Sequence, residues 1–217
     1  MLHFVDVETT GLRPWDGQEI IEIAIITEHG DGRVERYCTK IKPTRLEFAE
    51  VKALEVNGYN PEDWAHAPYM SEKIGEIYNI LRKGIIVGHN VSFDCLFIDF
   101  ELERYGFGRC SYSKVDTITL AHEHLLPVGL KSVGLQGIRK YMGWSLDGAH
   151  TALVDAEDCR RLYHSLIRRT WFPKGMSDIL SDTPIVHRGL GIVSSVVTWV
   201  LWKRPMPRLH GNLDLIQ

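Results

Sequence analysis

The stretch Phe4-Val5-Asp6-Val7-Glu8-Thr9-Thr10-Gly11-Leu12 places two carboxylates inside an apolar run. In a β-strand, residues i and i+2 point to the same face, so Asp6 and Glu8 project together. Two like charges side by side in an apolar strand cost free energy unless a cation neutralises them. The pattern therefore predicts a strand that carries a charged site. A solvated edge strand, with both acids on its exposed face, is the alternative.

The composition is that of an ordinary soluble globular chain. The 217 residues are 44% hydrophobic and 24% charged, with a formal net charge of −3, and this length can bury one sizeable core with some chain left over. From residue 160 onward basic residues outnumber acidic ones, so the acids concentrate in the preceding part. An acidic region beside a basic end could meet a polyanion through bound cations, and chance asymmetry is the alternative.

No segment predicts export or membrane insertion. Asp6 and Glu8 interrupt the first apolar run, so no secretory signal is expected. The four cysteines lack C-x-x-C spacing, which argues against a zinc site or a disulfide framework. The apolar segment 189–202 is shorter than the roughly 20 residues that span a bilayer. We expect a cytoplasmic protein that does not bind a membrane, or one in the host cytoplasm if the source is viral.

The order of the expected elements predicts an α/β fold. After the opening strand, further strands are expected at residues 19–27, 33–41, 84–88 and 114–116. Helices are expected over residues 47–56, 70–82, 131–142 and 151–169, and another ends at Leu102. The first three strands are predicted to form an antiparallel meander. The alternation that follows adds two parallel strands, which gives a mixed five-stranded sheet flanked by helices.

Acids stand at two further places where apolar residues would otherwise be expected. Asp94 falls in the first turn of an otherwise apolar helix, and Asp155 lies in the last long helix, five residues after His150. Four carboxylates without cysteine ligands suit hard divalent cations such as Mg²⁺ or Mn²⁺ better than zinc. Two such ions, held about 3.5–4 Å apart, can orient an attacking water and stabilise the leaving oxygen of a phosphodiester.

Three segments resemble the motifs of a known family. They are residues 4–12 (FVDVETTGL), residues 89–94 (HNVSFD) and residues 150–155 (HTALVD). In type, order and separation they look like the motifs of the DEDDh, or DnaQ-like, 3′–5′ exonuclease superfamily, and this resemblance implies a ribonuclease H-like fold. The similarity spans roughly residues 2–170. Thr151 stands where a sister group carries a tyrosine, so the resemblance is to the histidine-containing subclass.

The resemblance implies roles for the motif residues. Asp6, Glu8, Asp94 and Asp155 would bind two Mg²⁺ or Mn²⁺ ions, with Asp6 touching both. His150 would be the general base that deprotonates the attacking water. The ordinary pKa of histidine, near 6.5, suits that role independently. A histidine in a surface loop is the alternative reading of His150.

The resemblance also implies how the 3′ end is held. Thr9 would contact the terminal nucleotide and Leu12 would wedge against its base. His89, Asn90 and Phe93 would line the pocket for the sugar and base, where an aromatic ring tolerates any base. For Phe93 and Leu12, simple core packing is the alternative.

Other polar residues of the same region are given structural roles. Asp116 follows the last expected strand and is predicted to be a structural cap. Six other acids are predicted to be solvated charges of helices or loops: Asp99, Glu101, Glu103, Asp147, Glu157 and Asp158.

The resemblance ends near Arg169, which predicts an exonuclease domain over residues 1–171 and an extension over residues 172–217. Within the extension, residues 189–202 read as an amphipathic helix that packs on the domain or contacts a partner. Residues 212–216 (NLDLI) resemble the pentapeptide that binds the bacterial sliding clamp, although both ends depart from it. The extension is therefore a candidate for binding a DNA polymerase or a sliding clamp.

The leading hypothesis is a metal-dependent enzyme that releases 5′-mononucleotides from the 3′ end of single-stranded DNA, in proofreading or repair. RNA trimming is an alternative, because the same chemistry serves both and no residue decides whether a 2′-OH is accepted. A non-catalytic subunit that binds a polymerase or clamp is the third reading. The presence of all four acids and His150 argues against it.

Overall fold

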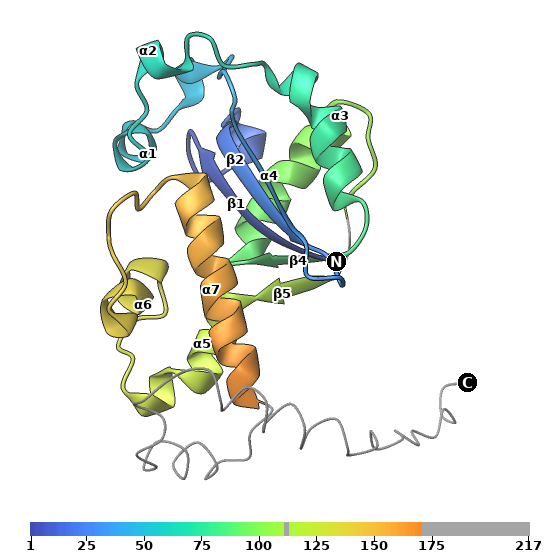
Figure 1. The fold of residues 1–217 in the computed structure, drawn as a ribbon. Coiled ribbons are helices and arrows are strands. Elements are labelled where there is room, and N and C mark those ends of the chain that lie inside the picture. The colour runs from blue at the N-terminus through green and yellow to red at the C-terminus, as the bar shows by residue number, and fades with distance from the viewer. Residues whose placement is uncertain (111–112, 171–217) are drawn as a thin grey trace, which may run out of the picture. The chain divides into compact units, whose positions relative to one another are not determined.

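The extended segments of the chain form one mixed sheet of five strands. They are β1 (Leu2–Thr9), β2 (Ile20–Glu28), β3 (Val34–Lys40), β4 (Ile85–Gly88) and β5 (Lys114–Asp116). Their order across the sheet is β3-β2-β1-β4-β5 (Figure 1). β2 is antiparallel to β1 and β3, whereas β4 is parallel to β1 and β5. The predicted meander with two parallel strands is confirmed.

The computed structural model describes residues 1–110 and 113–170. In this part of the chain the helices are α1 (Val51–Val56), α2 (Pro61–Trp64), α3 (Met70–Leu81), α4 (Val91–Arg104), α5 (Thr117–His124), α6 (Leu135–Met142) and α7 (Ala152–Thr170). The predicted extension, with its amphipathic helix and clamp-like pentapeptide, lies outside the described residues. None of the helices described is both long and apolar enough to cross a membrane.

Three details of the predicted helices are wrong. The helix expected over residues 47–56 is broken, because Ala49 has an extended backbone with ψ 141°. The helix expected from residue 131 begins only at Leu135. Helix α5 was not expected, since its first residues are β-branched and favour strands. The Asp116 side chain nevertheless starts α5 by accepting a hydrogen bond from the Ile118 N–H at 2.8 Å, which confirms its predicted role as a cap.

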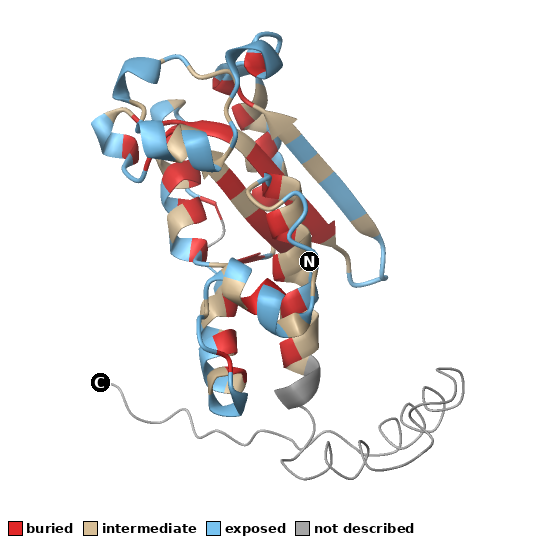
Figure 2. Ribbon diagram, turned by 90° about the vertical axis from the view of Figure 1, so that its left-hand side faces the viewer, coloured by how far each residue is buried: buried red, intermediate tan, exposed pale blue. Residues whose placement is uncertain are grey.

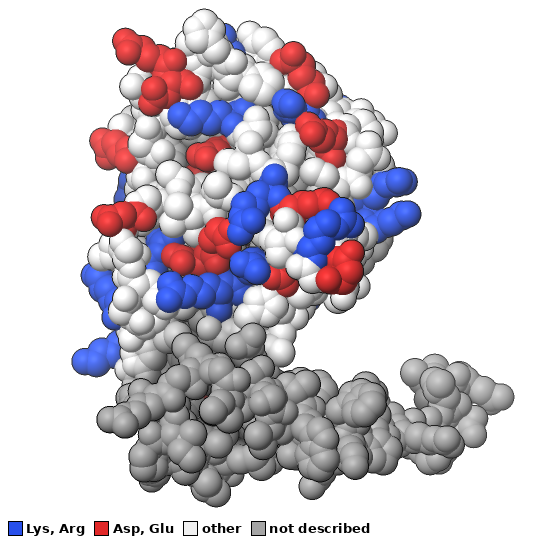
Figure 3. Space-filling model, in the orientation of Figure 1, with Lys and Arg blue, Asp and Glu red and all other residues white. Residues whose placement is uncertain are grey.

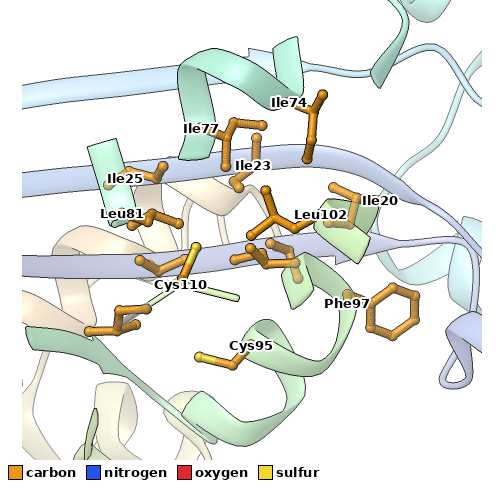
Figure 4. Close-up of a cluster of buried hydrophobic side chains, with 14 of the residues drawn as sticks. Ile20, Ile23, Ile25, Ile74, Ile77, Leu81, Cys95, Phe97, Leu102 and Cys110 are labelled. Carbon is orange, nitrogen blue, oxygen red and sulfur yellow. The ribbon is translucent and has the colours of Figure 1, made fainter. Parts of the chain in front are cut away.

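Alternation along β1 divides the core between the two faces of the sheet. The central strands are largely buried (Figure 2). Val5 and Val7 point to one face, where they join a cluster with α3 and α4 that includes Ile77, Phe97 and Leu102 (Figure 4). Phe4 points to the other face and packs with residues of α7. Asp6 and Glu8 follow Phe4 on the α7 face, so the pleat of β1 directs both acids toward α7.

The pairing of β1 ends on one side before the strand does. β4 pairs with β1 only from Leu2 to Phe4, while β2 continues along β1 to Thr9. The far half of β1 therefore has backbone groups that β4 does not reach. The chain turns from β4 into α4 at this point, and the first turn of α4 supplies the missing partner.

A matched pair of leucines in α4 tests this account of the core. Leu102 is fully buried, whereas Leu96 is 39% exposed. Leu102→Ala is expected to lower the free energy of unfolding by about 2–5 kcal/mol, because it leaves a cavity between α4 and the sheet. Leu96→Ala should change it by no more than about 0.5 kcal/mol. Urea denaturation of both variants measures the difference, and equal losses would contradict the arrangement.

Candidate active site

The two acids of β1 lie at the end of the strand, on the face covered by α7. Asp6 and Glu8 are partly exposed, while the residues on either side of each are buried. Glu8 stands directly opposite Glu22 of β2 in the antiparallel register. The strand thus carries its charges at the rim of the sheet rather than on an open edge, so the alternative of a solvated edge strand is excluded.

Asp94 is fixed against the same strand from the first turn of α4. Its Oδ1 accepts a hydrogen bond from the backbone N–H of Val7 at 3.0 Å. Val7 lies between the two acids of β1, and Asp94 is 3% exposed. The backbone donor that β4 leaves unpaired is therefore satisfied by a carboxylate, which brings a third acid to the end of β1.

The third motif completes the cluster from the start of α7. Single ligand atoms of Glu8, His150 and Asp155 all lie within 4.8 Å of one another. His150 has a left-handed backbone with φ 66° just before α7 begins, a conformation uncommon for residues other than glycine. Asp155 lies one turn into the helix and is 9% exposed. We call Asp6, Glu8, Asp94 and Asp155 the carboxylate cluster.

Burial raises the pKa values of three acids of the carboxylate cluster, and neighbouring charges add to the effect. Burial is the main cause for Asp6, and the charges of Asp94, Asp155 and Glu8 raise its pKa further. Burial followed by repulsion from Asp155 raises the pKa of Glu8 to about 8. Burial raises the pKa of Asp94 to about 7, against the opposing effect of the Val7 hydrogen bond. A cation bound nearby would favour the ionised form of these carboxylates.

The donors present fit a hard divalent cation. Glu8 and Asp155 supply carboxylate oxygen atoms and His150 supplies one nitrogen, and no cysteine takes part in this group. Oxygen-rich sites of this kind suit Mg²⁺ and Mn²⁺, and a cation between the carboxylates would relieve the repulsion that raises the pKa of Glu8.

A buried arginine holds the Asp155 carboxylate. Arg139 of α6 is 1% exposed, and its Nη2 donates to Oδ1 of Asp155 at 2.6 Å. Its Nε donates to Oδ2 of Asp158 at 2.6 Å. One guanidinium therefore bridges two acids a single turn apart on α7, which fixes the helix that carries the third motif. The helical pattern of α6 gave no sign that this arginine would be buried.

Two further residues hold the third motif and were also missed. Gln136, one turn before Arg139, places its amide nitrogen 2.7 Å from Nε2 of His150. An amide N–H donated there would leave the proton of the neutral ring on Nδ1. Glu22 accepts a backbone hydrogen bond from Ala152 at the start of α7, and burial raises its pKa. An acid in the otherwise apolar β2 was the signal available for Glu22.

Two of the residues predicted to hold the terminal nucleotide, Thr9 and Leu12, lie at the end of β1 and in the loop that follows it. Leu12 is 63% exposed, so the alternative of core packing is excluded for it. Thr9 is buried, and its hydroxyl donates to the Gly11 carbonyl at 2.6 Å. The Thr9 carbonyl accepts from the Asn57 amide at 2.9 Å. Thr9 therefore shapes the loop that presents Leu12.

The second motif forms the turn between β4 and α4. Asn90 has a left-handed backbone with φ 72°, and its N–H donates to Asp116 at 3.1 Å. His89 is half-buried, with Nδ1 2.9 Å from the hydroxyl of Thr117. Phe93 packs on Phe97 with ring centroids 5.1 Å apart and is only partly buried. Phe93 thus contributes to the core and also retains some exposed surface.

Two acids predicted to be solvated are not. Glu101 is 2% exposed and lies near Arg104 and Arg45, whose charges oppose the effect of burial on its pKa. Asp158 is the second acceptor of Arg139. In both cases an arginine from another part of the chain, or from the next turn, compensates the burial of the carboxylate.

The sequence matches a family model. RNase_T, described as an exonuclease, matches residues 4–163, which include all three motifs. Among curated relatives, DNA polymerase III subunit epsilon of Treponema pallidum (strain Nichols) is 28% identical over 162 residues, or 75% of this chain and 74% of that one. PolC-type DNA polymerase III of Thermotoga maritima is 33% identical over 152 residues, 70% of this chain but only 11% of that protein.

Solved structures share the fold. Exonuclease I of E. coli in complex with a dT13 oligonucleotide superposes with a TM-score of 0.66 at 20% identity, over 82% of this chain and 43% of that one. Exonuclease X in complex with 5′ overhanging duplex DNA gives a TM-score of 0.57 at 22% identity, over 82% and 99% of the two chains. At this identity the likeness concerns the fold, and it confirms the predicted ribonuclease H-like arrangement.

Glu8 gives a prediction about pH and stability. Its pKa is raised from 4.5 to about 8, so the native state binds more protons than the unfolded state between these values. Stability contributed by this group is therefore lost as the pH rises from about 4.5 to about 8. In metal-free protein, Glu8→Gln should raise Tm more at pH 8.5 than at pH 5.5. The exposed Glu103→Gln should show no such trend, and an equal gain at both pH values for Glu8→Gln would contradict it.

Arg139 gives a second prediction. Arg139→Met should lower the free energy of unfolding by about 3–5 kcal/mol, because two carboxylates lose their buried partner. Arg139→Lys should lose less, since the charge is retained but one ammonium cannot reproduce the guanidinium fork. The control is Arg33→Met, which breaks an exposed pair with Glu35 that should contribute about 0–1 kcal/mol. Equal losses for Arg139→Met and Arg33→Met in chemical denaturation would rule out a stabilising bridge.

Proposed function

Because this chain belongs to the exonuclease family whose model matches residues 4–163, we propose that it releases 5′-mononucleotides one at a time from the 3′ end of single-stranded DNA. Family membership confirms the sequence-based prediction of a 3′–5′ exonuclease. The observation that carries the finer proposal is the convergence of Glu8, His150 and Asp155 within 4.8 Å. Asp94 lies beside them, where its carboxylate accepts a hydrogen bond from the Val7 N–H of β1.

The carboxylate cluster would hold two Mg²⁺ or Mn²⁺ ions. Bound there, the ions would polarise the phosphoryl oxygens, activate water and neutralise charge on the leaving oxygen. The cluster's own part is to keep four carboxylates at one point of the fold. The Val7 N–H and the Arg139 guanidinium each hold one carboxylate of this set in place.

His150 would act as the general base. In the proposed reaction a water oxygen bonds to the phosphorus of the terminal nucleotide while His150 takes a proton from that water. The bond between phosphorus and the 3′ oxygen of the preceding nucleotide breaks, and that oxygen takes up a proton from solvent. The products are a 5′-mononucleotide and a strand shortened by one residue. Nε2 can accept the proton only after it leaves the Gln136 amide.

The loop after β1 and the second motif would bind the terminal nucleotide. The exposed Leu12 would wedge against its base, with Thr9 shaping the loop. His89, Asn90 and Phe93 would line the sugar and base pocket at the turn before α4. We favour DNA because the curated relatives are named as DNA polymerase III proteins, and a role in proofreading or repair fits them. RNA trimming would use the same site, since phosphodiester chemistry does not depend on the 2′-OH.

A DNA polymerase or sliding clamp is the partner that we propose for residues 172–217. The names of the relatives and the clamp-like residues 212–216 support this partner. The protein would then act in the cytoplasm. A pull-down against a clamp, with and without residues 211–217, tests it. Equal retention of both chains would contradict it.

A degradation assay tests the proposed reaction. We expect wild-type protein with Mg²⁺ or Mn²⁺ to turn a 5′-labelled single-stranded DNA into a ladder of products that differ by one nucleotide. Asp155→Ala should abolish the ladder by removing a cation ligand, and His150→Ala should slow it by about 10²–10⁴-fold, the range for a general base. A matching RNA in parallel decides between the two substrates.

Two outcomes would contradict the proposal. A full ladder from Asp155→Ala would show that the carboxylate cluster is not the catalytic centre. Failure of the wild type to shorten either strand with either metal would favour the non-catalytic subunit. Glu103→Ala, an exposed acid outside the cluster, is the control and should degrade like the wild type.

A further inference from the structure

A cavity beside α6 plays no part in the chemistry described so far. It has a volume of about 610 Å³ and lies between residues 129–132 and the face of α6 that carries Gln136, Gly137, Lys140 and Tyr141. This volume is in the range of ordinary ligand sites. The loop lies close against the helix, because a Cβ at Gly137 would be only 2.7 Å from the Ser132 carbonyl oxygen. We call this space the α6 cavity.

The α6 cavity is positively charged. Lys131 and Lys140 line it from opposite walls, and no acid is among the lining residues. Both lysines are exposed, and neither forms an ion pair within the described part of the chain. On the face seen in Figure 3, acidic and basic side chains are intermixed. The cavity wall instead carries two lysines and no acid, and this combination suits an anionic ligand.

The α6 cavity also presents an aromatic ring. Tyr141 is 42% exposed. Its hydroxyl donates to the Val128 carbonyl at 3.0 Å, which anchors the ring at the wall. Cations together with an exposed, anchored aromatic ring are the features by which proteins bind single strands, the cations for phosphates and the ring for a stacked base.

The α6 cavity adjoins the proposed catalytic centre. Gln136 lines the cavity and also contacts Nε2 of His150 at 2.7 Å. A strand with its terminal phosphate at the carboxylate cluster would therefore reach the cavity within a short distance along its backbone. The acidic cluster repels phosphates, so a basic surface next to it is where the rest of the strand gains binding energy.

From these observations we infer that the α6 cavity binds the substrate strand on the 5′ side of the nucleotide being removed. Lys131 and Lys140 contact its phosphates and Tyr141 stacks with one of its bases. The inference rests on the proposed function and extends it, since it assigns a subsite for the strand rather than for the reacting bond. The proposed contacts involve only the phosphates and the bases of the strand, so the inference applies to DNA and to RNA alike.

Charge reversal at the two lysines tests the inference. Lys131→Glu/Lys140→Glu should raise KM for a single-stranded oligonucleotide by about 10-fold or more at low salt, with little change in kcat. The slope of log binding constant against log salt should become shallower by about 0.7 for each lysine removed. Hydrolysis of thymidine 5′-(p-nitrophenyl phosphate), which occupies only the catalytic centre, should not change. Tyr141→Leu should raise KM for the oligonucleotide without changing the salt slope.

Matched controls keep the test specific. Lys83→Glu makes the same charge change at an exposed lysine before β4, at the opposite end of that strand from the catalytic centre. Tyr69→Leu removes a ring that is 45% exposed elsewhere on the surface. Both controls should bind and cleave the oligonucleotide like the wild type, and thermal melts verify that each variant is folded.

Failure of the inference differs from failure of the proposed function. If Lys131→Glu/Lys140→Glu leaves both the oligonucleotide KM and the salt slope unchanged, the α6 cavity is not a subsite for the strand. This conclusion holds whatever the activity on thymidine 5′-(p-nitrophenyl phosphate). If wild-type protein cleaves neither substrate, the proposed function fails. Fluorescence anisotropy with a labelled oligonucleotide in the Glu8→Gln background then still tests the cavity, because it needs no turnover. Equal affinity with and without the lysine changes would overturn it there too.

Discussion

The burial of several carboxylates close together at the end of β1 is the constraint on which the rest of the structure depends. The pleat of β1 sends Asp6 and Glu8 to the face beneath α7, and Asp94 bonds to the backbone between them. Asp155 lies in the first turn of α7, so four acids share one small region. Burial, with repulsion from neighbouring acids, raises the pKa values of Asp6, Glu8 and Asp94 there. A fold keeps such a costly arrangement only where surrounding contacts hold it. Here those contacts are the short pairing of β4 with β1 and the buried Arg139.

Helix α6 connects the chemistry to the surface. Arg139 holds the Asp155 carboxylate, and Gln136 holds the imidazole of His150. The same short helix also faces the α6 cavity, through Gln136, Lys140 and Tyr141. One element of two turns therefore fixes both parts of the third motif and lines the proposed path of the strand. A strand that entered the cavity would lie against Gln136, the residue that contacts the proposed general base His150.

The sheet and the four acids could be predicted from the sequence because their signals are local. Charges at i and i+2 in an apolar strand, and acids in the first turns of two helices, are visible without tertiary contacts. Arg139 and Gln136 could not be predicted, because the burial of a charged side chain depends on a partner across the fold, here Asp155 and Asp158. Helix α5 was missed for a similar reason: its β-branched start favours a strand, and the Asp116 cap decides otherwise. Glu101 was predicted to be solvated, and it is buried beside two arginines.

Metal binding tests the central claim most directly. Crystals of the wild-type chain soaked in Mn²⁺ should show two anomalous peaks among Asp6, Glu8, Asp94 and Asp155, with the Asp6 carboxylate between them. The separation of the peaks should be about 3.5–4 Å, as in two-metal sites. Crystals of Asp6→Asn should lose at least one peak. Absence of Mn²⁺ from this cluster in the wild type, or peaks only at other acids, would contradict the account.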